Sequence, residues 1–526
     1  MLTPSPPVRS DSQRSATRSA MTVAVVLAMA LALFLRLVAL GKGGFWLDEV
    51  FSASFANLSA VGTVLAVFLH DVHPPLYYLQ LNAWGQLGHG DYWLLLNSVF
   101  WSALTLTAVY FGVRAQFGAG AALLSLAFCA VLGSEIYFAQ QLRMYAMYSC
   151  LAVLSWVCAH RVLTDFRFSR AVPFILVLAL VGAVHSASLI GASSALLYVL
   201  PIGAVKPSRQ RMLTWCAIAL VVMCAFAPWV INSSHRHVGH PLPVSILVAS
   251  GTIGGWLIGY GNALPSWAAP AASVLVLAAL SVTITLLPQL RRLILCYIVW
   301  PLAFGALICI AVEPIWLERT FAFCGPFVGI AFGTAASSWF SRASAHGPPV
   351  SVALRASLIG FVIAALAIID YRQATTPYKP DQFRDLAEYL AQAAKPDELI
   401  YANEGVSLWG IGRYLLGPDW GDILKVYDLA DLERLKKWHR LESLLGDATL
   451  AKLGAVPTTR RLDGFRVPIF IGSSPLPDLA QANSVWLVTD GTPPQDLAPC
   501  ADSSTYPAPL AFGRLRLYHV PCAHAG

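Results

Sequence analysis

Long apolar runs separated by short basic segments are the feature that most restricts what this chain can form. A membrane-spanning helix needs roughly 20 mostly apolar residues, and by that criterion the sequence holds about eleven such runs. Only 12% of the 526 residues are charged, which is about half the share of a typical soluble domain. The sequence therefore predicts a polytopic α-helical membrane protein. The predicted spans are Met21–Leu40, Tyr92–Gly112, Gly120–Ile136, Met144–Arg161, Val172–His185, Leu189–Ile202, Leu213–Ile231, Ala268–Leu287, Leu293–Val312, Thr320–Trp339 and Ser351–Asp370.

Some of these runs differ from a regular span. Val172–His185 and Leu189–Ile202 are short for a bilayer. A further run, Val244–Leu264, is rich in glycine, and we expect an interfacial or re-entrant segment there. Met21–Leu40 is too long for a cleaved signal and follows a polar, Arg-bearing arm, so it is predicted to be a retained signal anchor.

The distribution of basic residues orients the spans. If the N-terminus is cytoplasmic and the spans alternate, about fourteen basic side chains face the cytoplasm and about four face outward. This bias predicts a bacterial-type inner (plasma) membrane protein whose C-terminal region is extracytoplasmic. The net charge of +7 does not predict a nucleic-acid partner, because the basic residues form no long stripe.

Three segments follow from this pattern: a cytoplasmic arm over 1–20, a transmembrane block over 21–370 with a long first extracytoplasmic loop at 41–91, and a soluble extracytoplasmic domain over 371–526. In the last, Asp381–Ala394 has helical spacing. An α/β domain that acts as a lid or scaffold is expected, since it has no nucleotide-binding glycine loop and no nucleophile motif. The predicted strands are Glu398–Ala402, Arg466–Ile471, Val485–Thr489 and Arg514–Val520.

Two cysteines, Cys500 and Cys522, lie in this soluble segment, whereas the other eight lie in apolar runs. In an extracytoplasmic domain these two can pair as a disulfide. Their spacing alone does not fix the geometry that a disulfide needs. A disulfide and two free thiols therefore both remain open.

The loop at 41–91 is long and aromatic, and it is expected to form two interfacial helices, over Val50–Phe68 and from His73 to about Leu87. An acidic pair, Asp48-Glu49, opens the first of them, just beyond the outer end of the first span. Carboxylates near hydrocarbon are costly to ionise and are rarely without a function, and such a group can take a proton in catalysis. A helix cap is the alternative, because Asp is common just before a helix.

Three motifs occur in order: Phe45-Trp-Leu-Asp-Glu49, His73-Pro-Pro-Leu-Tyr-Tyr78 and Gln140-Gln-Leu-Arg-Met-Tyr145. This ordered set, with its topology, resembles the GT-C superfamily of integral-membrane glycosyltransferases over roughly residues 21–340. Within it, the chain is similar to the branch that includes bacterial aminoarabinose transferase and the protein O-mannosyltransferases. The resemblance implies a catalytic acid in the first extracytoplasmic loop and a polyprenyl-phosphate-linked monosaccharide as donor.

This resemblance assigns roles to particular residues. Asp48 is expected to be the base and Glu49 a weaker second catalytic carboxylate. A single displacement inverts the anomeric carbon and needs no carboxylate nucleophile, but cations must stabilise the departing phosphate. The candidate donor-phosphate and substrate-binding residues are Arg319, His73, Arg143, Tyr145, His185 and Tyr77.

Some of these have a structural alternative, and the third motif departs from the family pattern. Arg319, where the tenth predicted span re-enters the membrane, can instead be a snorkelling interfacial residue. His185 can be a structural imidazole on an apolar helix. Relatives commonly have Gln-Glu where this chain has Gln140-Gln141, and Glu135 is a nearby acid that can substitute.

No cofactor is required by the sequence, although a divalent ion held by Asp48 and Glu49 remains open. His235, His237 and His240 match no closed metal site and favour a solvated loop. The expected partners are the lipid-linked donor, membrane lipids, and a glycolipid, polysaccharide or protein acceptor. A transporter or flippase of a lipid-linked sugar is the alternative, although no repeated halves are visible. A third reading, a non-catalytic assembly protein, predicts that Asp48 is dispensable.

Overall fold

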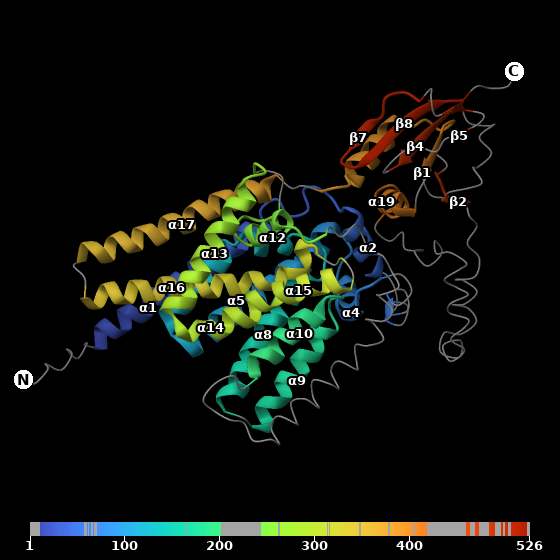
Figure 1. Cartoon of the computed structure of the whole chain (residues 1–526). Coiled ribbons are helices and arrows are strands. Elements are labelled where there is room, and N and C mark those ends of the chain that lie inside the picture. Colours follow the sequence, from blue (N-terminus) through green and yellow to red (C-terminus); the bar gives the residue numbers. More distant parts are fainter. Residues whose placement is uncertain are drawn as a thin grey trace, which may run out of the picture. The chain divides into compact units, whose positions relative to one another are not determined.

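The structure is a computed structural model that divides into two compact units. The membrane unit comprises Met1–Leu40, Val72–Pro74 and Ser98–Thr376, and the loop–sheet unit comprises Gly41–Asp71, Pro75–Asn97 and Pro377–Gly526. Figure 1 shows the helices of the first and the sheet of the second. The structure describes residues 11–56, 60, 63–64, 67, 71–165, 167–200, 243–260, 264–312, 314, 316–346, 349–376, 379–402, 405–417, 459–462, 469–472, 483–489, 496–497, 500–502 and 506–522.

Among the described residues, seven helical segments are long and apolar enough to cross a membrane, or eight if α6 (Ala119–Ala130) and α7 (Gly133–Ala139), bent by 60°, form one span. The chain is therefore a multi-helix membrane protein, while the predicted number of about eleven spans is not confirmed. The seven segments lie in α1 (Asp11–Leu37), α5 (Asp91–Phe117), α8 (Tyr145–Thr164), α13 (Ala268–Leu286), α14 to α15 (Pro288–Ala311), η2 (Glu318–Cys324) with α16 (Gly325–His346), and α17 (Pro349–Thr375). A π-helix, η1 (Leu295–Val299), lies between α14 and α15, and η2 is a 3₁₀-helix.

Two of three shorter apolar helices explain part of the difference in number. The three are α9 (Phe168–Gly182), α10 (Ser188–Val199) and α12 (Ile246–Ile258). The first two occupy the two predicted short spans, and the third lies in the glycine-rich run. The predicted span Leu213–Ile231 lies outside the described residues.

Close helix packing in the membrane unit depends on small residues. The helix α16 packs against α6, and Figure 1 shows it alongside α17. A Cβ atom added to Gly333 on α16 would lie 2.2 Å from the backbone nitrogen of Ser125 on α6. Glycine is therefore required there for the two backbones to approach, as is usual where helices associate in a bilayer.

Arg36 ties α1 to the rest of this unit from a fully buried position. Its guanidinium donates to the Ser102 hydroxyl at 2.7 Å and to the carbonyls of Ala130 and Cys129, both at 3.1 Å. These carbonyls are at the C-terminal end of α6, where a helix presents unsatisfied acceptors and a partial negative charge. A costly charge in the apolar interior is thereby satisfied.

Two helices of the predicted outer loop belong to the loop–sheet unit. They are α2 (Leu47–Phe55) and α4 (Leu76–Gly85). The Asn82 amide on α4 donates to the Phe55 and Ala56 carbonyls at 3.2 and 3.3 Å, so α4 caps the C-terminal end of α2. The predicted division kept the whole loop at 41–91 with the membrane block, whereas the structure groups most of it with the C-terminal residues.

The C-terminal residues form a six-stranded mixed sheet in the order β2-β3-β1-β4-β8-β7. β1 pairs in parallel with β3 and β4, and the other pairings are antiparallel. The predicted helix and the four predicted strands are all present, as α18, β1, β3, β4 and β8. The elements are α18 (Phe383–Ala393), β1 (Leu399–Ala402), α19 (Gly405–Leu416), β2 (Thr459–Leu462), β3 (Ile469–Gly472), β4 (Ser484–Thr489), β7 (Leu510–Phe512), β8 (Leu515–Pro521), and a separate two-stranded pair of β5 (Asp496–Leu497) and β6 (Ala501–Asp502).

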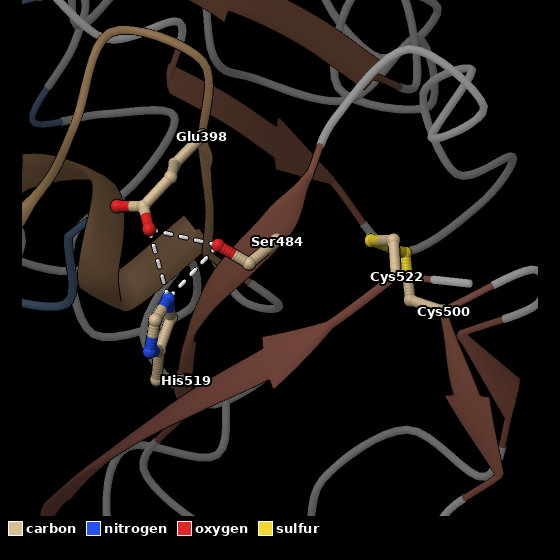
Figure 2. The surroundings of a disulfide bond; sticks show 5 residues. All are labelled: Glu398, Ser484, Cys500, His519 and Cys522. Carbon is tan, nitrogen blue, oxygen red and sulfur yellow. Dashed lines mark hydrogen bonds and ion pairs between the residues drawn. A yellow bond between two sulfur atoms is a disulfide. The ribbon is translucent and has the colours of Figure 1, made fainter. Parts of the chain in front are cut away.

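A disulfide joins Cys500 to Cys522 (Figure 2). Both cysteines belong to or pack against an apolar cluster that includes Leu399 and Val485. The pairing that the sequence left open is thus formed in the structure.

Candidate functional site

The acidic pair of the first motif opens helix α2 in the loop–sheet unit. Glu49 is fully buried, whereas Asp48 is half-buried. One Glu49 carboxylate oxygen accepts the backbone N–H of Trp46 at 3.2 Å. The Trp46 carbonyl accepts the first helical hydrogen bonds, from Glu49 and Val50, both at 2.9 Å. A glutamate at this third helical position satisfies an otherwise unpaired donor and lies at the positive end of the helix.

Lys379 is the main partner of Glu49. Its ammonium lies 2.7 Å from each Glu49 carboxylate oxygen and is itself mostly buried. A divalent ion shared by Asp48 and Glu49 does not fit this arrangement, because a lysine ammonium already neutralises Glu49. Within the described part of the chain, no group of three or more His, Cys, Asp or Glu side chains could hold a metal ion, and His235, His237 and His240 lie outside it.

A second cluster forms in the membrane unit around two histidines. His73, Arg143, Tyr145 and His185 are all buried. The His73 and His185 ring centroids lie 4.6 Å apart, and the Tyr145 and His185 centroids lie 5.9 Å apart. His185 also stacks on Tyr148 with a centroid distance of 5.3 Å. Residues far apart in the sequence thus meet within this unit.

The protonation of His73 follows from its surroundings. Burial lowers the pKa of the imidazole well below its usual range, and the nearby Arg143 and Arg319 charges lower it further. The Nδ1 atom accepts the backbone N–H of Ser186 at 3.2 Å, which leaves the proton on Nε2. His73 is therefore a neutral hydrogen-bond donor here and not a cation.

His185 has the same tautomer for the same reason. Its Nδ1 accepts the backbone N–H of Ala187 at 3.0 Å. Its Nε2 is buried and has no hydrogen-bond partner among the residues that the structure describes. A buried donor without a partner is costly in a folded protein and often indicates a site for a ligand or water.

Arg319 lies in η2 and is half-buried. The surrounding segment is held by two tryptophan side chains. The Trp256 indole donates to the Phe321 carbonyl at 3.2 Å, and the Trp316 indole donates to the Thr252 hydroxyl at 3.0 Å. These bonds attach η2 to α12. Arg319 is thereby placed on a fixed backbone, with its charge near His73.

The predicted site residues therefore divide between the two units. His73, Arg143, Tyr145, His185 and Arg319 belong to the membrane unit. Asp48, Glu49 and Tyr77 belong to the loop–sheet unit, where Tyr77 is fully buried on α4 with its ring against Tyr78.

Gln140 of the third motif has a structural role. Its amide donates to the carbonyls of Leu35, Arg36 and Val38 at 3.3, 3.2 and 3.0 Å. It therefore caps the C-terminal end of α1. Glu135, the acid proposed as a substitute in this region, is buried, and one of its carboxylate oxygens has no hydrogen-bond partner among the described residues.

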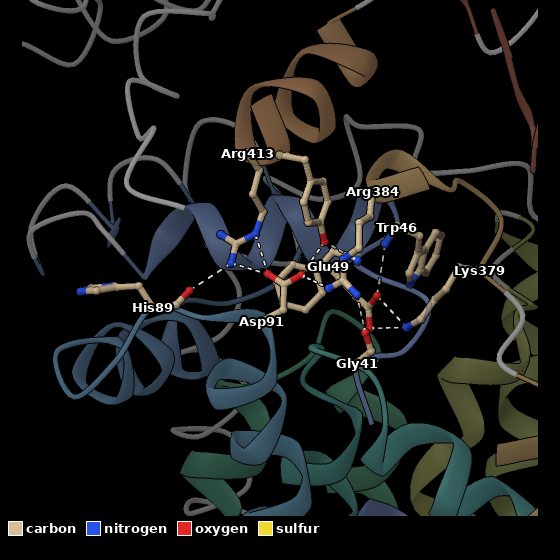
Figure 3. A network of polar contacts seen from close by, with 10 residues as sticks. Gly41, Trp46, Glu49, His89, Asp91, Lys379, Arg384 and Arg413 are labelled. Atoms are coloured by element: carbon tan, nitrogen blue, oxygen red, sulfur yellow. Dashed lines mark hydrogen bonds and ion pairs between the residues drawn. The ribbon is translucent and has the colours of Figure 1, made fainter. Parts of the chain in front are cut away.

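Residues from the C-terminal part of the chain also contact the segment that holds the acidic pair, above all Lys379 and Tyr414. The sequence analysis does not predict these residues. The Tyr414 hydroxyl accepts the backbone N–H of Phe45 at 2.7 Å. Figure 3 shows Lys379 beside Glu49, together with a network around Asp91. These contacts join segments more than 300 residues apart, so no local pattern could have identified them.

The chain thus combines a helical membrane unit with a C-terminal unit built on a mixed sheet. Solved structures with this fold include ArnT, the aminoarabinose transferase of Cupriavidus metallidurans, in the apo state. It is 15% identical, with 96% of this chain and 99% of that chain covered and a TM-score of 0.58. The same protein bound to undecaprenyl phosphate gives a TM-score of 0.50 at 15% identity, with 95% and 99% covered.

The oligosaccharyltransferase of Archaeoglobus fulgidus, in complex with zinc and sulfate, matches at 12% identity with a TM-score of 0.45, over 74% of this chain and 61% of that chain. No protein-family model matches the sequence, and no curated protein matches it. The likeness to ArnT is one of fold, and at the level of the fold it confirms the predicted resemblance to GT-C glycosyltransferases.

Proposed function

We propose that this protein is an inverting membrane glycosyltransferase that moves a monosaccharide from a polyprenyl-phosphate donor to an extracytoplasmic acceptor. The observation that carries the proposal is the cluster of buried His73, His185 and Arg143 with the half-buried Arg319. It combines two cations with two neutral imidazoles that each carry a proton on Nε2. The planar guanidinium groups of arginine and the N–H groups of neutral imidazoles can donate hydrogen bonds to the oxygens of a phosphate group.

In this reaction Asp48 takes the proton of the acceptor hydroxyl as the acceptor oxygen attacks the anomeric carbon. The bond between that carbon and the donor phosphate oxygen breaks, and polyprenyl phosphate leaves with the bonding electrons. Arg319 and Arg143 stabilise the charge that develops on the departing phosphate, and His73 donates a hydrogen bond to it. The configuration of the anomeric carbon is inverted because there is one displacement.

The two carboxylates of the acidic pair have different roles in this proposal. Glu49 is held by Lys379 and by the Trp46 N–H, so its position is fixed by the helix start. Asp48 is one residue earlier on α2 and, at about 100° per residue, faces another direction. We therefore assign Asp48 as the base and Glu49 as a residue that holds α2 in place.

The proposal places the acceptor reaction on the outer side of a bacterial-type inner membrane, with a glycolipid, polysaccharide or protein acceptor. The outward placement rests on the basic residues of the predicted inner loops and on the disulfide, which persists in oxidising compartments.

A reconstituted assay tests the proposal. Purified protein in proteoliposomes receives a panel of polyprenyl phosphates that carry labelled pentoses, hexoses or amino sugars, together with cell-envelope acceptor fractions. Acceptor-dependent transfer of label, with release of polyprenyl phosphate, is the expected result. Movement of intact labelled lipid between leaflets, with no bond broken, would instead establish the flippase alternative.

A further inference from the structure

The segment that carries the acidic pair is held at successive points by side chains from the C-terminal part of the chain. We name Gly41–Glu49 the acid loop. Arg384 donates to the Gly41 carbonyl at 2.8 Å, and the Leu47 N–H donates to the Asp381 carboxylate at 3.2 Å. The remaining two contacts are those of Tyr414 with Phe45 and of Lys379 with Glu49. All of these residues belong to the loop–sheet unit.

Asp91 connects this arrangement to the first turn of α5. Its carboxylate lies 2.6 Å from the Arg384 guanidinium and 2.6 Å from that of Arg413, and it accepts the Tyr414 hydroxyl at 2.6 Å. Arg413 also donates to the His89 carbonyl at 3.1 Å. Three donors from α18 and α19 therefore converge on one acid. Figure 3 shows two of them, Arg384 and Arg413.

The Tyr414 hydroxyl is shared between the Asp91 carboxylate and the Phe45 backbone. Burial raises its pKa above the usual value, and the charge of Asp91 raises it further. The hydroxyl therefore stays protonated and donates to Asp91 while it accepts from Phe45. One atom thus links the acid loop to the Asp91 network.

Gly44 shows that the loop is fitted closely against α18. Its φ of +67° favours glycine. A Cβ atom added there would lie 2.9 Å from the Cβ of Arg384. Both the backbone conformation and the space therefore require glycine at this point of the acid loop.

We propose that Lys379, Asp381, Arg384, Arg413 and Tyr414, named here the clasp, position the acid loop so that Asp48 is held ready for proton transfer. The two neighbours of Asp48, Leu47 and Glu49, are each bound directly by a clasp residue. This inference rests on the proposed function, because it assigns the C-terminal domain the task of ordering the catalytic carboxylate. The clasp residues are positioning residues that act through the acid loop.

Tyr414→Phe is the sharpest test, because it removes one oxygen atom and retains the ring. We expect kcat to fall by about 10- to 100-fold, since small misplacements of a catalytic group cost this much, while KM for the lipid-linked donor changes by less than about twofold, because only the catalytic group is displaced. Hydrogen exchange measured by mass spectrometry should increase in residues 41–55, with the β4 and β8 peptides unchanged. Arg413→Met should show the same pattern, and Arg413→Lys should restore part of kcat.

Tyr389→Phe is the matched control. Tyr389 lies on α18, where its ring contacts Trp486 and Phe512 rather than the acid loop. Unchanged kcat and unchanged exchange over residues 41–55 in Tyr414→Phe would overturn the clasp, even if the native protein transfers sugar. Loss of exchange protection throughout the loop–sheet unit would also overturn it, in favour of a general stabilising role.

The exchange measurement needs no turnover. A native protein that transfers no sugar, but whose acid loop loosens selectively in Tyr414→Phe, would therefore overturn the proposed function and retain the clasp as the device that orders the loop.

Discussion

The Lys379 ammonium contacts both carboxylate oxygens of Glu49, at 2.7 Å each. The Glu49 side chain is fully buried, and the Lys379 side chain is 11% exposed. Desolvation of two charges costs energy that a well-placed pair regains, whereas removal of one partner leaves the other charge buried and uncompensated. The pair therefore fixes the start of α2 more than it adds net stability.

Lys379→Met should destabilise the loop–sheet unit by about 3–5 kcal/mol, because it leaves Glu49 buried without a countercharge. The thermal midpoint of unfolding, followed by tryptophan fluorescence in detergent, measures the effect. The double variant Lys379→Met/Glu49→Gln should recover much of the loss. A single variant as stable as the native protein would show that the ion pair does not hold α2.

Glu398 makes the stability of the sheet depend on pH. Burial raises the pKa of its carboxyl, but hydrogen bonds from the Lys395 N–H, Trp486, Ser484 and His519 outweigh burial and bring the pKa below the ordinary 4.5. Glu398, Ser484 and His519 are drawn in Figure 2. Because the folded state has the lower pKa, this stabilisation is complete above about pH 4.5 and is lost as the pH falls through the folded-state pKa.

Glu398→Gln should therefore lower the thermal midpoint near neutral pH and reduce the loss of stability between about pH 5 and pH 3. Thermal unfolding measured across that range tests this. Glu388→Gln, at an exposed position on α18, is the control and should follow the native curve. Parallel curves for the native protein and Glu398→Gln would contradict the assignment.

The disulfide should stabilise the C-terminal sheet. Cys500 and Cys522 are 22 residues apart, a loop for which cross-linking contributes about 3 kcal/mol. Cys500→Ser/Cys522→Ser should lower the urea midpoint accordingly. Dithiothreitol should shift the native protein by the same amount and leave the double variant unchanged. If the reductant breaks the disulfide of the native protein but leaves its urea midpoint unchanged, this prediction is contradicted.

Topology can be tested with reporters fused after Gly526. Because the basic loops predict a cytoplasmic N-terminus and an extracytoplasmic C-terminal domain, alkaline phosphatase should be active there and a cytoplasmic reporter should be inactive. The opposite pattern would reverse the orientation and place the acid loop in the cytoplasm.

Local patterns in the sequence were sufficient to predict much of the C-terminal domain. Apolar spacing predicts α18, and short β-rich segments predict β1, β3, β4 and β8, because these signals are contained in a few consecutive residues. The number of spans was harder to predict. The short runs that contain α9 and α10 were counted as spans, and hydropathy does not show that α6 and α7 are bent by 60°.

The site shows the same limit. Ordered motifs singled out Asp48, His73 and Arg143 as candidates, but they did not show that Glu49 pairs with Lys379, 330 residues away in sequence. Nor did they show that Gln140 caps α1. These contacts depend on the tertiary fold, which brings together segments that have no local signal in common.

The most direct test of Asp48 as the base is the transfer rate of Asp48→Asn in proteoliposomes supplied with the lipid-linked sugar that the native protein uses. Loss of the base should lower kcat by about 10²- to 10⁴-fold, with the thermal midpoint and donor KM close to the native values. Asp385→Asn, at an exposed position on α18, should transfer sugar at the native rate. Native turnover by folded Asp48→Asn would contradict the central claim that this carboxylate performs the chemistry.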